Sequence, residues 1–137
     1  MHLKFLPHGK GSARAAVEYL VGERDAAGQE REGVEVLRGN PDTVAAVADS
    51  LDFERKYRSA VIAWAPEDRP TEEQIEAVLD EFEKTAWAGL EPDRYAWTVI
   101  LHRESRGGVH AHILAAQCDL ETGRSLNSKC PWRRMLL

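Results

Sequence analysis

The sequence contains no long apolar run and no apolar region near its first residue. The longest stretch of uncharged apolar residues, Ala60–Pro66, is much shorter than the roughly 20 residues that a helix needs to span a bilayer. Residues Met1–Lys10 also lack the apolar core of a secretory signal. We therefore expect a protein that has no membrane segment.

Cysteine is scarce, and the sequence contains no repeats. The two cysteines, Cys118 and Cys130, lie twelve positions apart and form no Cys-x-x-Cys pair. Two isolated thiols in a chain without a signal favour a reducing compartment over a disulfide framework. We therefore expect the protein to work in the cytoplasm.

Basic residues are outnumbered: 18 Lys and Arg stand against 23 Asp and Glu, and the formal net charge is −5. Taken alone, this balance argues against nucleic-acid binding, which usually needs a basic surface. The acids are concentrated, however, because residues 67–93 carry a net charge of −8 and the rest of the chain carries +3. Residues 1–17 and 122–137 contain bases and no acids. A polyanion can therefore still bind away from the acidic segment.

The chain of 137 residues, 43% hydrophobic and 30% charged, has the size and composition of one globular domain. Apolar periodicity, turn residues and the N-cap residues Ser12, Asn40 and Thr71 divide it into elements in the order βαβαβαββ. The strands are expected at His2–Leu6, Val34–Arg38, Arg58–Ala65, Tyr95–His102 and Val109–Gln117, and the helices at Ala13–Glu23, Pro41–Leu51 and Thr71–Ala88. A short loop with two glycines makes the last two strands an antiparallel hairpin. The pattern predicts an α+β fold in which helices cover one face of an antiparallel sheet.

Three of the five histidines, His102, His110 and His112, lie in the predicted hairpin. Side chains alternate across a strand, so His110 and His112 point to one face, and the hairpin brings His102 opposite them. Three converging imidazoles form a ready site for a divalent metal, and imidazole ligands by themselves favour Zn²⁺, Ni²⁺ or Cu²⁺. Glu104, in the loop, is a candidate for orienting one imidazole. The alternative is a set of polar side chains on an exposed strand face, with Glu104 as a solvated loop residue.

A metal site does not define a reaction, and the chain offers three tyrosines as possible nucleophiles. Tyr19 lies on the first predicted helix, at the flank of its apolar stripe, where half-buried packing is the alternative role. Tyr57 and Tyr95 begin predicted strands and are better explained as packing residues of the sheet. The residues alone leave the role of Tyr19 open.

Two motifs resemble those of a known family. The sequence His110-Ala-His112, after the upstream His102, resembles the His-hydrophobe-His motif of the HUH endonucleases. The segment Gly11–Leu20 (GSARAAVEYL) resembles the N-terminal motif of plasmid mobilisation relaxases of the MobA/MobQ kind, in which a glycine-serine turn opens a helix that carries the nucleophilic tyrosine. Both motifs occur in the order that the family has: strand, tyrosine helix and then histidine hairpin.

This resemblance implies site- and strand-specific nicking and rejoining of DNA in plasmid mobilisation. Tyr19 would attack the scissile phosphorus and form a 5′-phosphotyrosyl intermediate. His102, His110 and His112 would hold Mg²⁺ or Mn²⁺ in function, with Zn²⁺ or Ni²⁺ as ions retained on purification. The implied partners are single-stranded DNA at an origin of transfer and accessory mobilisation proteins, in a bacterial cytoplasm. We expect a monomer.

Seven side chains near the two motifs are candidates for DNA contact. Basic groups neutralise phosphates, and short polar groups donate hydrogen bonds to phosphate oxygens. The candidates are Lys4, His8, Lys10, Ser12, Arg14, Arg103 and Arg106.

Two features depart from the family's usual pattern. Related relaxases often place a carboxylate on the central strand, but Arg58–Ala65 contains none. Family domains also continue past the histidine hairpin, whereas we expect a catalytic domain at residues 1–124 and an irregular, truncated tail at 125–137. Two alternatives therefore stay open: an inactive relaxase-like module that binds DNA and metal, and a three-histidine metal hydrolase unrelated to DNA.

Overall fold

The computed structural model describes residues 1–22, 24, 26–30 and 33–126. Its elements follow the predicted order, with two short 3₁₀ turns added. The strands are β1 (His2–Leu6), β2 (Gly33–Arg38), β3 (Tyr57–Trp64), β4 (Trp97–Arg103) and β5 (Val109–Ala116); the helices are α1 (Ala13–Val21), α2 (Pro41–Asp49) and α3 (Glu72–Ala86); the 3₁₀ turns are η1 (Pro66–Asp68) and η2 (Pro92–Arg94). The predicted tail at 127–137 and the predicted helix end at Glu23 lie outside the described residues.

The predicted elements are confirmed in number and type, and their ends differ by a few residues. One shift concerns Tyr95, which we expected to begin a strand. It follows the 3₁₀ turn η2 directly, and β4 begins only at Trp97. Pro92 explains the shift, because proline at the first position favours a helical turn at this point.

The strands form one antiparallel sheet in the order β1-β3-β5-β4-β2. The β4–β5 hairpin therefore occupies the middle of the sheet, as expected, with β5 at its centre. The α+β class and the antiparallel sheet are confirmed.

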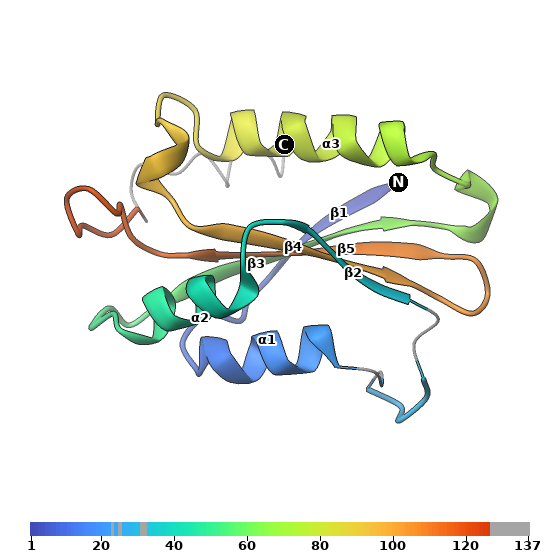
Figure 1. Cartoon of the computed structure of the whole chain (residues 1–137), viewed down its shortest axis with the longest axis horizontal. Coiled ribbons are helices and arrows are strands. Elements are labelled where there is room, and N and C mark those ends of the chain that lie inside the picture. Colours follow the sequence, from blue (N-terminus) through green and yellow to red (C-terminus); the bar gives the residue numbers. More distant parts are fainter. Residues whose placement is uncertain (23, 25, 31–32, 127–137) are drawn as a thin grey trace.

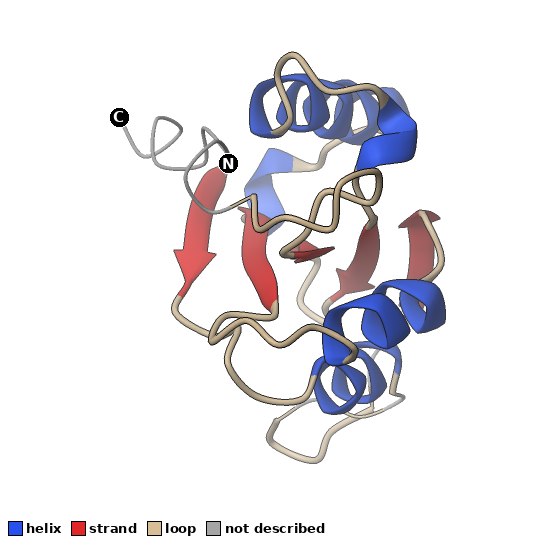
Figure 2. Cartoon of the chain, turned by 90° about the vertical axis from the view of Figure 1, so that its left-hand side faces the viewer, coloured by secondary structure: helices blue, strands red, loops and turns tan. Residues whose placement is uncertain are grey.

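The expectation that helices cover only one face of the sheet is wrong. Helix α3 covers one face, and helices α1 and α2 cover the other (Figures 1 and 2). The physical reason is that the central strands are apolar on both faces: Val99 and Leu101 pack under α3, whereas Ile100 packs under α1 and α2. Among the residues that the structure describes, no helix has the length and apolar composition needed to cross a membrane.

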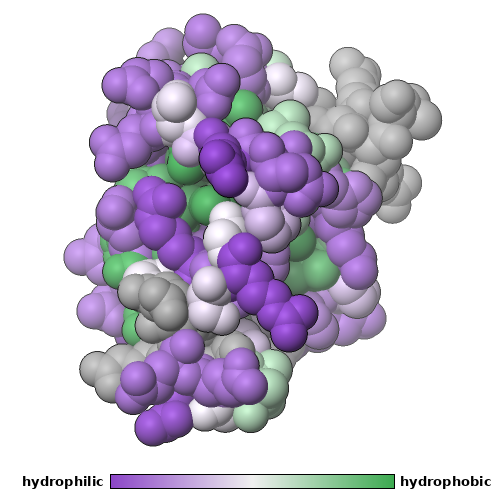
Figure 3. Space-filling model, turned by 90° about the vertical axis from the view of Figure 1, so that its right-hand side faces the viewer, coloured by the Kyte–Doolittle hydropathy of each residue, from purple (hydrophilic) through white to green (hydrophobic). Residues whose placement is uncertain are grey.

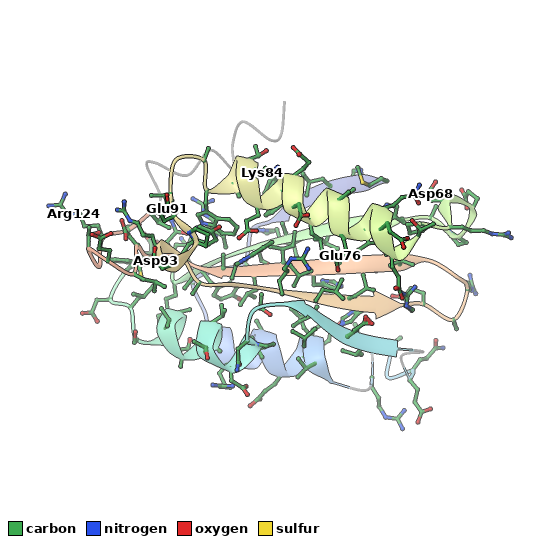
Figure 4. The ribbon with its side chains drawn as sticks, turned by 45° about the horizontal axis from the view of Figure 1, so that its top comes forward. Asp68, Glu76, Lys84, Glu91, Asp93 and Arg124 are labelled. Atoms are coloured by element: carbon green, nitrogen blue, oxygen red, sulfur yellow. The ribbon has the colours of Figure 1, made fainter. Side chains whose placement is uncertain are left out.

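Helix α3 carries much of the acidic charge on its outer face. Thr71 and Gln74 form a reciprocal capping box at its start, with hydrogen bonds of 2.9 and 3.1 Å. Ile75, Leu79 and Phe82 face the sheet and are buried. Figure 4 shows Glu76 on this helix, where it forms an ion pair with Arg38 of β2. The acidic segment is thus largely a solvated surface on the side of the sheet opposite α1.

Two side chains accept hydrogen bonds from the N–H groups of the first turn of helix α1. The Ser12 hydroxyl accepts one from the Ala15 N–H at 3.1 Å, which confirms Ser12 as the N-cap. The Asp49 carboxylate, at the end of α2, accepts two more, from Ala13 N–H at 2.7 Å and Arg14 N–H at 3.0 Å. Asp49 therefore fixes the start of α1 on α2.

Gly9 fixes the loop between β1 and α1. Its carbonyl accepts a hydrogen bond from Lys56 N–H at 2.7 Å, at the start of β3. Its φ is +154°, and a Cβ atom there would lie 2.3 Å from the Tyr57 carbonyl oxygen. Only glycine lets the loop approach β3 this closely.

We predict that Asp49→Ala destabilises the fold by about 1–2 kcal/mol, because two N–H groups of the first turn of α1 lose their acceptor. For a domain of this size the melting temperature should fall by about 3–6 °C. Asp42→Ala is the matched control, since Asp42 also joins α2 to α1, through an exposed ion pair with Arg14. Such a pair contributes less than about 1 kcal/mol. Equal losses in the two variants, measured by urea unfolding, would contradict the role given to Asp49.

We also predict that Gly9→Ala destabilises the fold by about 2 kcal/mol, because the new methyl group meets the Tyr57 carbonyl and the backbone must shift. Gly11→Ala, in the same loop, should be close to neutral, since a Cβ atom there would contact nothing within 4 Å. Thermal unfolding of both variants checks the prediction. If the Gly9→Ala protein is as stable as the Gly11→Ala protein, the close approach of Gly9 to β3 does not fix the loop.

Candidate active site

The strand register places the three predicted histidines on one face of the sheet. His102 and His110 are directly opposite each other, and His112 lies opposite Ile100. Paired residues point to the same face of an antiparallel sheet. Ile100 belongs to the core beneath α1 and α2, so the histidines lie on that side of the sheet.

The three rings lie near one another without converging on a common point. The ring centroids of His102 and His112 are 4.5 Å apart, and those of His110 and His112 are 6.1 Å apart. His102 is 3% exposed, and its Nε2 lies 2.6 Å from the carbonyl oxygen of Leu20. Among the described residues, no three His, Cys, Asp or Glu side chains are placed to hold a metal ion. The three-histidine metal site therefore stays a prediction.

Glu104 lies beside His110. Its Oε1 is 3.4 Å from His110 Nδ1, and both side chains are partly exposed. The hairpin loop is closed by a 2.8 Å hydrogen bond from Glu104 N–H to the Gly108 carbonyl, which holds Glu104 at the base of the loop. The orienting role of Glu104 stays a prediction, with His110 as the imidazole beside it.

Tyr19 and His112 open onto the same cavity. This cavity, of about 420 Å³, lies between α1 and the sheet and is also lined by His8, Ser12 and Tyr57. Tyr19 is 48% exposed, so this residue is accessible to a large substrate. The tyrosine motif and the histidine motif, about 90 positions apart in the sequence, thus meet at one hollow.

The other two tyrosines are buried. Tyr57 is 6% exposed, and burial raises the pKa of its hydroxyl. Tyr95 belongs to the core under α3, where it donates a 2.6 Å hydrogen bond to Glu83; burial and this bond raise its pKa. A buried hydroxyl that is harder to deprotonate is a poor nucleophile. Exposure therefore favours Tyr19.

A second cavity, of about 550 Å³, borders His110. It is lined by Glu104, Ser105 and Arg106 of the hairpin loop and by His2 of β1. The end of the molecule at which the β4–β5 hairpin turns is mostly hydrophilic, with small, separate apolar areas (Figure 3). His112 thus borders one of these two hollows and His110 borders the other.

Four of the seven candidate DNA contacts lie close to these hollows. His8 and Ser12 line the Tyr19 cavity, and Arg106 lines the second. Lys4 lies in the same row of the sheet as His112, through the pairs Lys4–Val61 and Val61–His112. These positions suit contacts to a strand that crosses the histidines.

The other three candidates are less well placed. Lys10 forms a 2.7 Å ion pair with Glu54, and Arg14 forms a 2.6 Å ion pair with Asp42, so both charges are already partly neutralised. Arg103 follows His102 directly and therefore points to the opposite face of the sheet, where it lines a cavity with Glu35 and Glu76 of the α3 side. Its contact with DNA at the histidines is not supported.

Sequence reasoning missed two residues near the site, His2 and Asp49. His2 aligns with His110 through Ala63, so a fourth histidine lies on the same face. In β1 the polar residues His2 and Lys4 alternate with apolar residues, which predicts that His2 and Lys4 lie on one face of the sheet. Only the pairing of β1 with β3 shows that this is the face of the other histidines. On that face β3 presents Ser59, Val61 and Ala63, so this strand supplies no carboxylate to the site.

Comparisons with known proteins identify relatives along most of the chain. The family described as "Relaxase: MobA/VirD2-like, nuclease domain" matches residues 19–136. The chain is 32% identical to DNA relaxase MbeA of Escherichia coli over 126 residues, which are 92% of this chain and 23% of that protein. It is 30% identical to cryptic plasmid protein C of Neisseria gonorrhoeae over 126 residues, which are 92% of this chain and 58% of that protein. The chain therefore spans only part of the length of these curated relatives.

A solved structure has a similar fold. It comes from work described as "Molecular Basis of Vancomycin Resistance Transfer in Staphylococcus aureus", and it covers 85% of this chain and 69% of its own with a TM-score of 0.54 and 16% identity. At this identity the likeness concerns the fold alone. The family match covers well over half of the chain and includes both Tyr19 and the histidine hairpin, so the chain belongs to the MobA/VirD2-like relaxase nuclease family.

Proposed function

We propose that this chain nicks and rejoins one DNA strand at a specific site during plasmid or mobile-element mobilisation, with Tyr19 as the nucleophile. The observation that carries the proposal is the cavity shared by the exposed Tyr19 and His112. Family membership supports a nuclease reaction, and the name DNA relaxase of one relative supports the class of substrate.

The reaction is a transesterification at one phosphodiester. The Tyr19 hydroxyl gives up its proton and its oxygen forms a bond to the scissile phosphorus. The bond from phosphorus to the 3′ oxygen breaks, and the departing oxygen takes up a proton as a free 3′-OH, so one proton is lost and one is gained. The number of phosphoester bonds does not change, so the step needs no external energy source and can run backward to rejoin the strand. The exposed position of Tyr19 lets it reach a phosphate outside the core.

Relaxase nucleases generally use a divalent metal, and Mg²⁺ or Mn²⁺ is the ion that the family resemblance implies. The sequence predicts His102, His110 and His112 as its ligands. As placed, this set does not fit one ion, because His102 Nε2 is bonded to the Leu20 carbonyl and the described residues include no group of three converging ligands. His110 and His112 are the members of the set that line the hollows, and Glu104 lies beside His110.

A single strand of DNA fits the arrangement of the two hollows. A strand whose scissile phosphate lies near Tyr19 and His112 would continue past His110 into the second cavity, beside Arg106. The acidic helix α3 lies on the opposite face of the sheet, so its repulsion is directed away from this path. Accessory mobilisation proteins and a monomeric state stay predictions.

A relaxase-like module that binds DNA without cutting it is the second candidate. One observation favours it: among the described residues, the histidines do not form a complete ligand set as placed. It predicts salt-dependent DNA binding without any covalent product under any metal. The same assay therefore separates the two candidates.

We predict that the protein forms a covalent adduct with single-stranded DNA in Mn²⁺, and that Tyr19→Phe abolishes it because the attacking oxygen is missing. A random-sequence pool of oligonucleotides avoids the need to know the target. In a denaturing gel, a 3′-end label should move with the protein and a 5′-end label should leave on the free fragment, as a 5′-phosphotyrosyl bond requires.

Tyr95→Phe is the matched control for this prediction. It also removes one tyrosine hydroxyl, but on the α3 side of the sheet, and should leave adduct formation intact. An adduct that survives Tyr19→Phe would refute the nucleophile assignment. DNA binding with no adduct under Mg²⁺, Mn²⁺ or Ni²⁺ would favour the binding module.

We further predict that Lys4→Ala and Arg106→Ala each weaken binding of single-stranded DNA, because each removes one charge beside the histidine path. Each should lower the slope of log affinity against log salt concentration by about 1. Arg124→Ala is the control, since the exposed Arg124 lies at the end of the molecule away from the β4–β5 turn (Figure 4). Fluorescence anisotropy across a salt series measures both quantities, and equal effects at Arg106 and Arg124 would rule out a localised path.

A further inference from the structure

We infer that His102 is a positioning residue: it holds the last turn of α1, and with it Tyr19, over the histidine hairpin. The hydrogen bond between its Nε2–H and the Leu20 carbonyl carries this role. The importance of the bond for the reaction rests on the proposed function of Tyr19, whereas the bond itself can be tested without DNA.

The geometry determines which atom carries the proton. A carbonyl oxygen can only accept, so at 2.6 Å from Leu20 the Nε2 of His102 must donate. A nitrogen that donates in this way has no lone pair for a metal ion. The side chain is 3% exposed and joins residues 82 positions apart, so the bond is a tertiary contact shielded from water. His102 thus differs from His110 and His112, which are partly exposed and line the hollows.

Helix α1 needs an anchor at this end. It is nine residues long, and isolated helices of that length are barely stable in water. Its start is held by Ser12 and Asp49. Its end has no left-handed glycine cap, because Gly22 is extended at φ −66°, and no basic side chain lies in its last turn. His102 supplies a buried donor to one of the carbonyls that the helix end leaves open.

The bond acts on the residue next to the proposed nucleophile. The Leu20 side chain is buried in the core with Ile100 and Leu114, and its carbonyl is bonded to His102, so the backbone at this position is fixed from two directions. Tyr19 precedes it and points into the cavity that it shares with His112. Because His102 is paired with His110 across β4 and β5, one hairpin carries both the histidines and the anchor of the tyrosine helix.

His102→Gln and His102→Leu separate this role from metal ligation. Glutamine can place an amide N–H near the position of Nε2 and donate the same bond, but it offers no imidazole nitrogen to a metal. Leucine fills similar space and cannot donate. His112→Gln is the matched control, because it makes the same substitution in the neighbouring ring, whose centroid is 4.5 Å away.

Three measurements are expected to agree. Hydrogen exchange at the amides of the last turn of α1 should accelerate by about tenfold in His102→Leu and remain close to wild type in His102→Gln. Adduct formation at saturating DNA should slow by about 100-fold in His102→Leu, as expected for a reacting group misplaced by about 1 Å, with DNA affinity unchanged, and His102→Gln should restore most of the rate. Affinity for Mn²⁺ and Ni²⁺, measured by titration calorimetry without DNA, should be similar in His102→Gln and wild type.

Two results would overturn the inference. The first is a loss of metal affinity in His102→Gln as large as that in His112→Gln, which would make His102 a ligand. The second is unchanged hydrogen exchange at the end of α1 in a folded His102→Leu protein, which would show that the bond to the Leu20 carbonyl does not stabilise the last turn of α1. A failure of the proposed function is recognised separately, because wild-type protein would then form no adduct while the exchange and calorimetry results still decide the position of His102.

Discussion

The attachment of helix α1 at both of its ends is the constraint on which the site depends. A helix of nine residues contributes little stability of its own, so its position is set by tertiary bonds. Asp49 holds its first turn on α2, and His102 holds its last turn on the central hairpin. Between these two attachments the apolar stripe packs on the sheet, and Tyr19 remains half-exposed on its flank. The position of Tyr19 therefore depends on three separate contacts of α1: the bonds to Asp49, the bond to His102 and the packing of the apolar stripe.

The two faces of the sheet divide the chemistry of the molecule. Helix α3 presents acidic side chains to solvent on one face, and the histidines lie with α1 on the other. Apolar residues on both sides of β4 make this division possible, because each face can bury a helix layer. The net charge of −5 is therefore a poor guide to the local field at the histidines. Helix α3, which carries six of the acids in the segment of net charge −8, lies on the far side of the sheet.

Local patterns predicted most of the fold. Ser12, Asn40 and Thr71 are N-caps as expected, because a cap depends only on residues within one helical turn. The shared face of the histidines followed from strand alternation, and the same rule would have placed Arg103 on the opposite face from His102. The second helix layer was missed because periodicity shows which side of a helix is buried, but not which face of the sheet it covers.

Contacts between distant residues could not be predicted in the same way. Asp49 bonds to a residue 36 positions away and His102 to one 82 positions away, and neither partner is marked by its own sequence surroundings. His102 in particular has the same residue type as its neighbours in the motif, so the sequence predicts the same role for all three. The strand register also does not distinguish the three histidines, because it places all of them on the same face of the sheet. Only the packing of α1 onto the hairpin distinguishes the buried ring from the two that face the hollows.

The placement of Tyr19 and Leu20 shows how a short helix can be firmly held and still expose one of its side chains. Adjacent residues on a helix point about 100° apart, so Leu20 can be buried while Tyr19 stays accessible. Fixing the backbone at Leu20 therefore limits the movement of Tyr19 without covering its hydroxyl. Because the fixing group comes from the hairpin that also carries His110 and His112, a displacement of the hairpin moves the histidines and the tyrosine helix together. The spacing between Tyr19 and the histidines therefore depends on one hydrogen bond between the hairpin and α1.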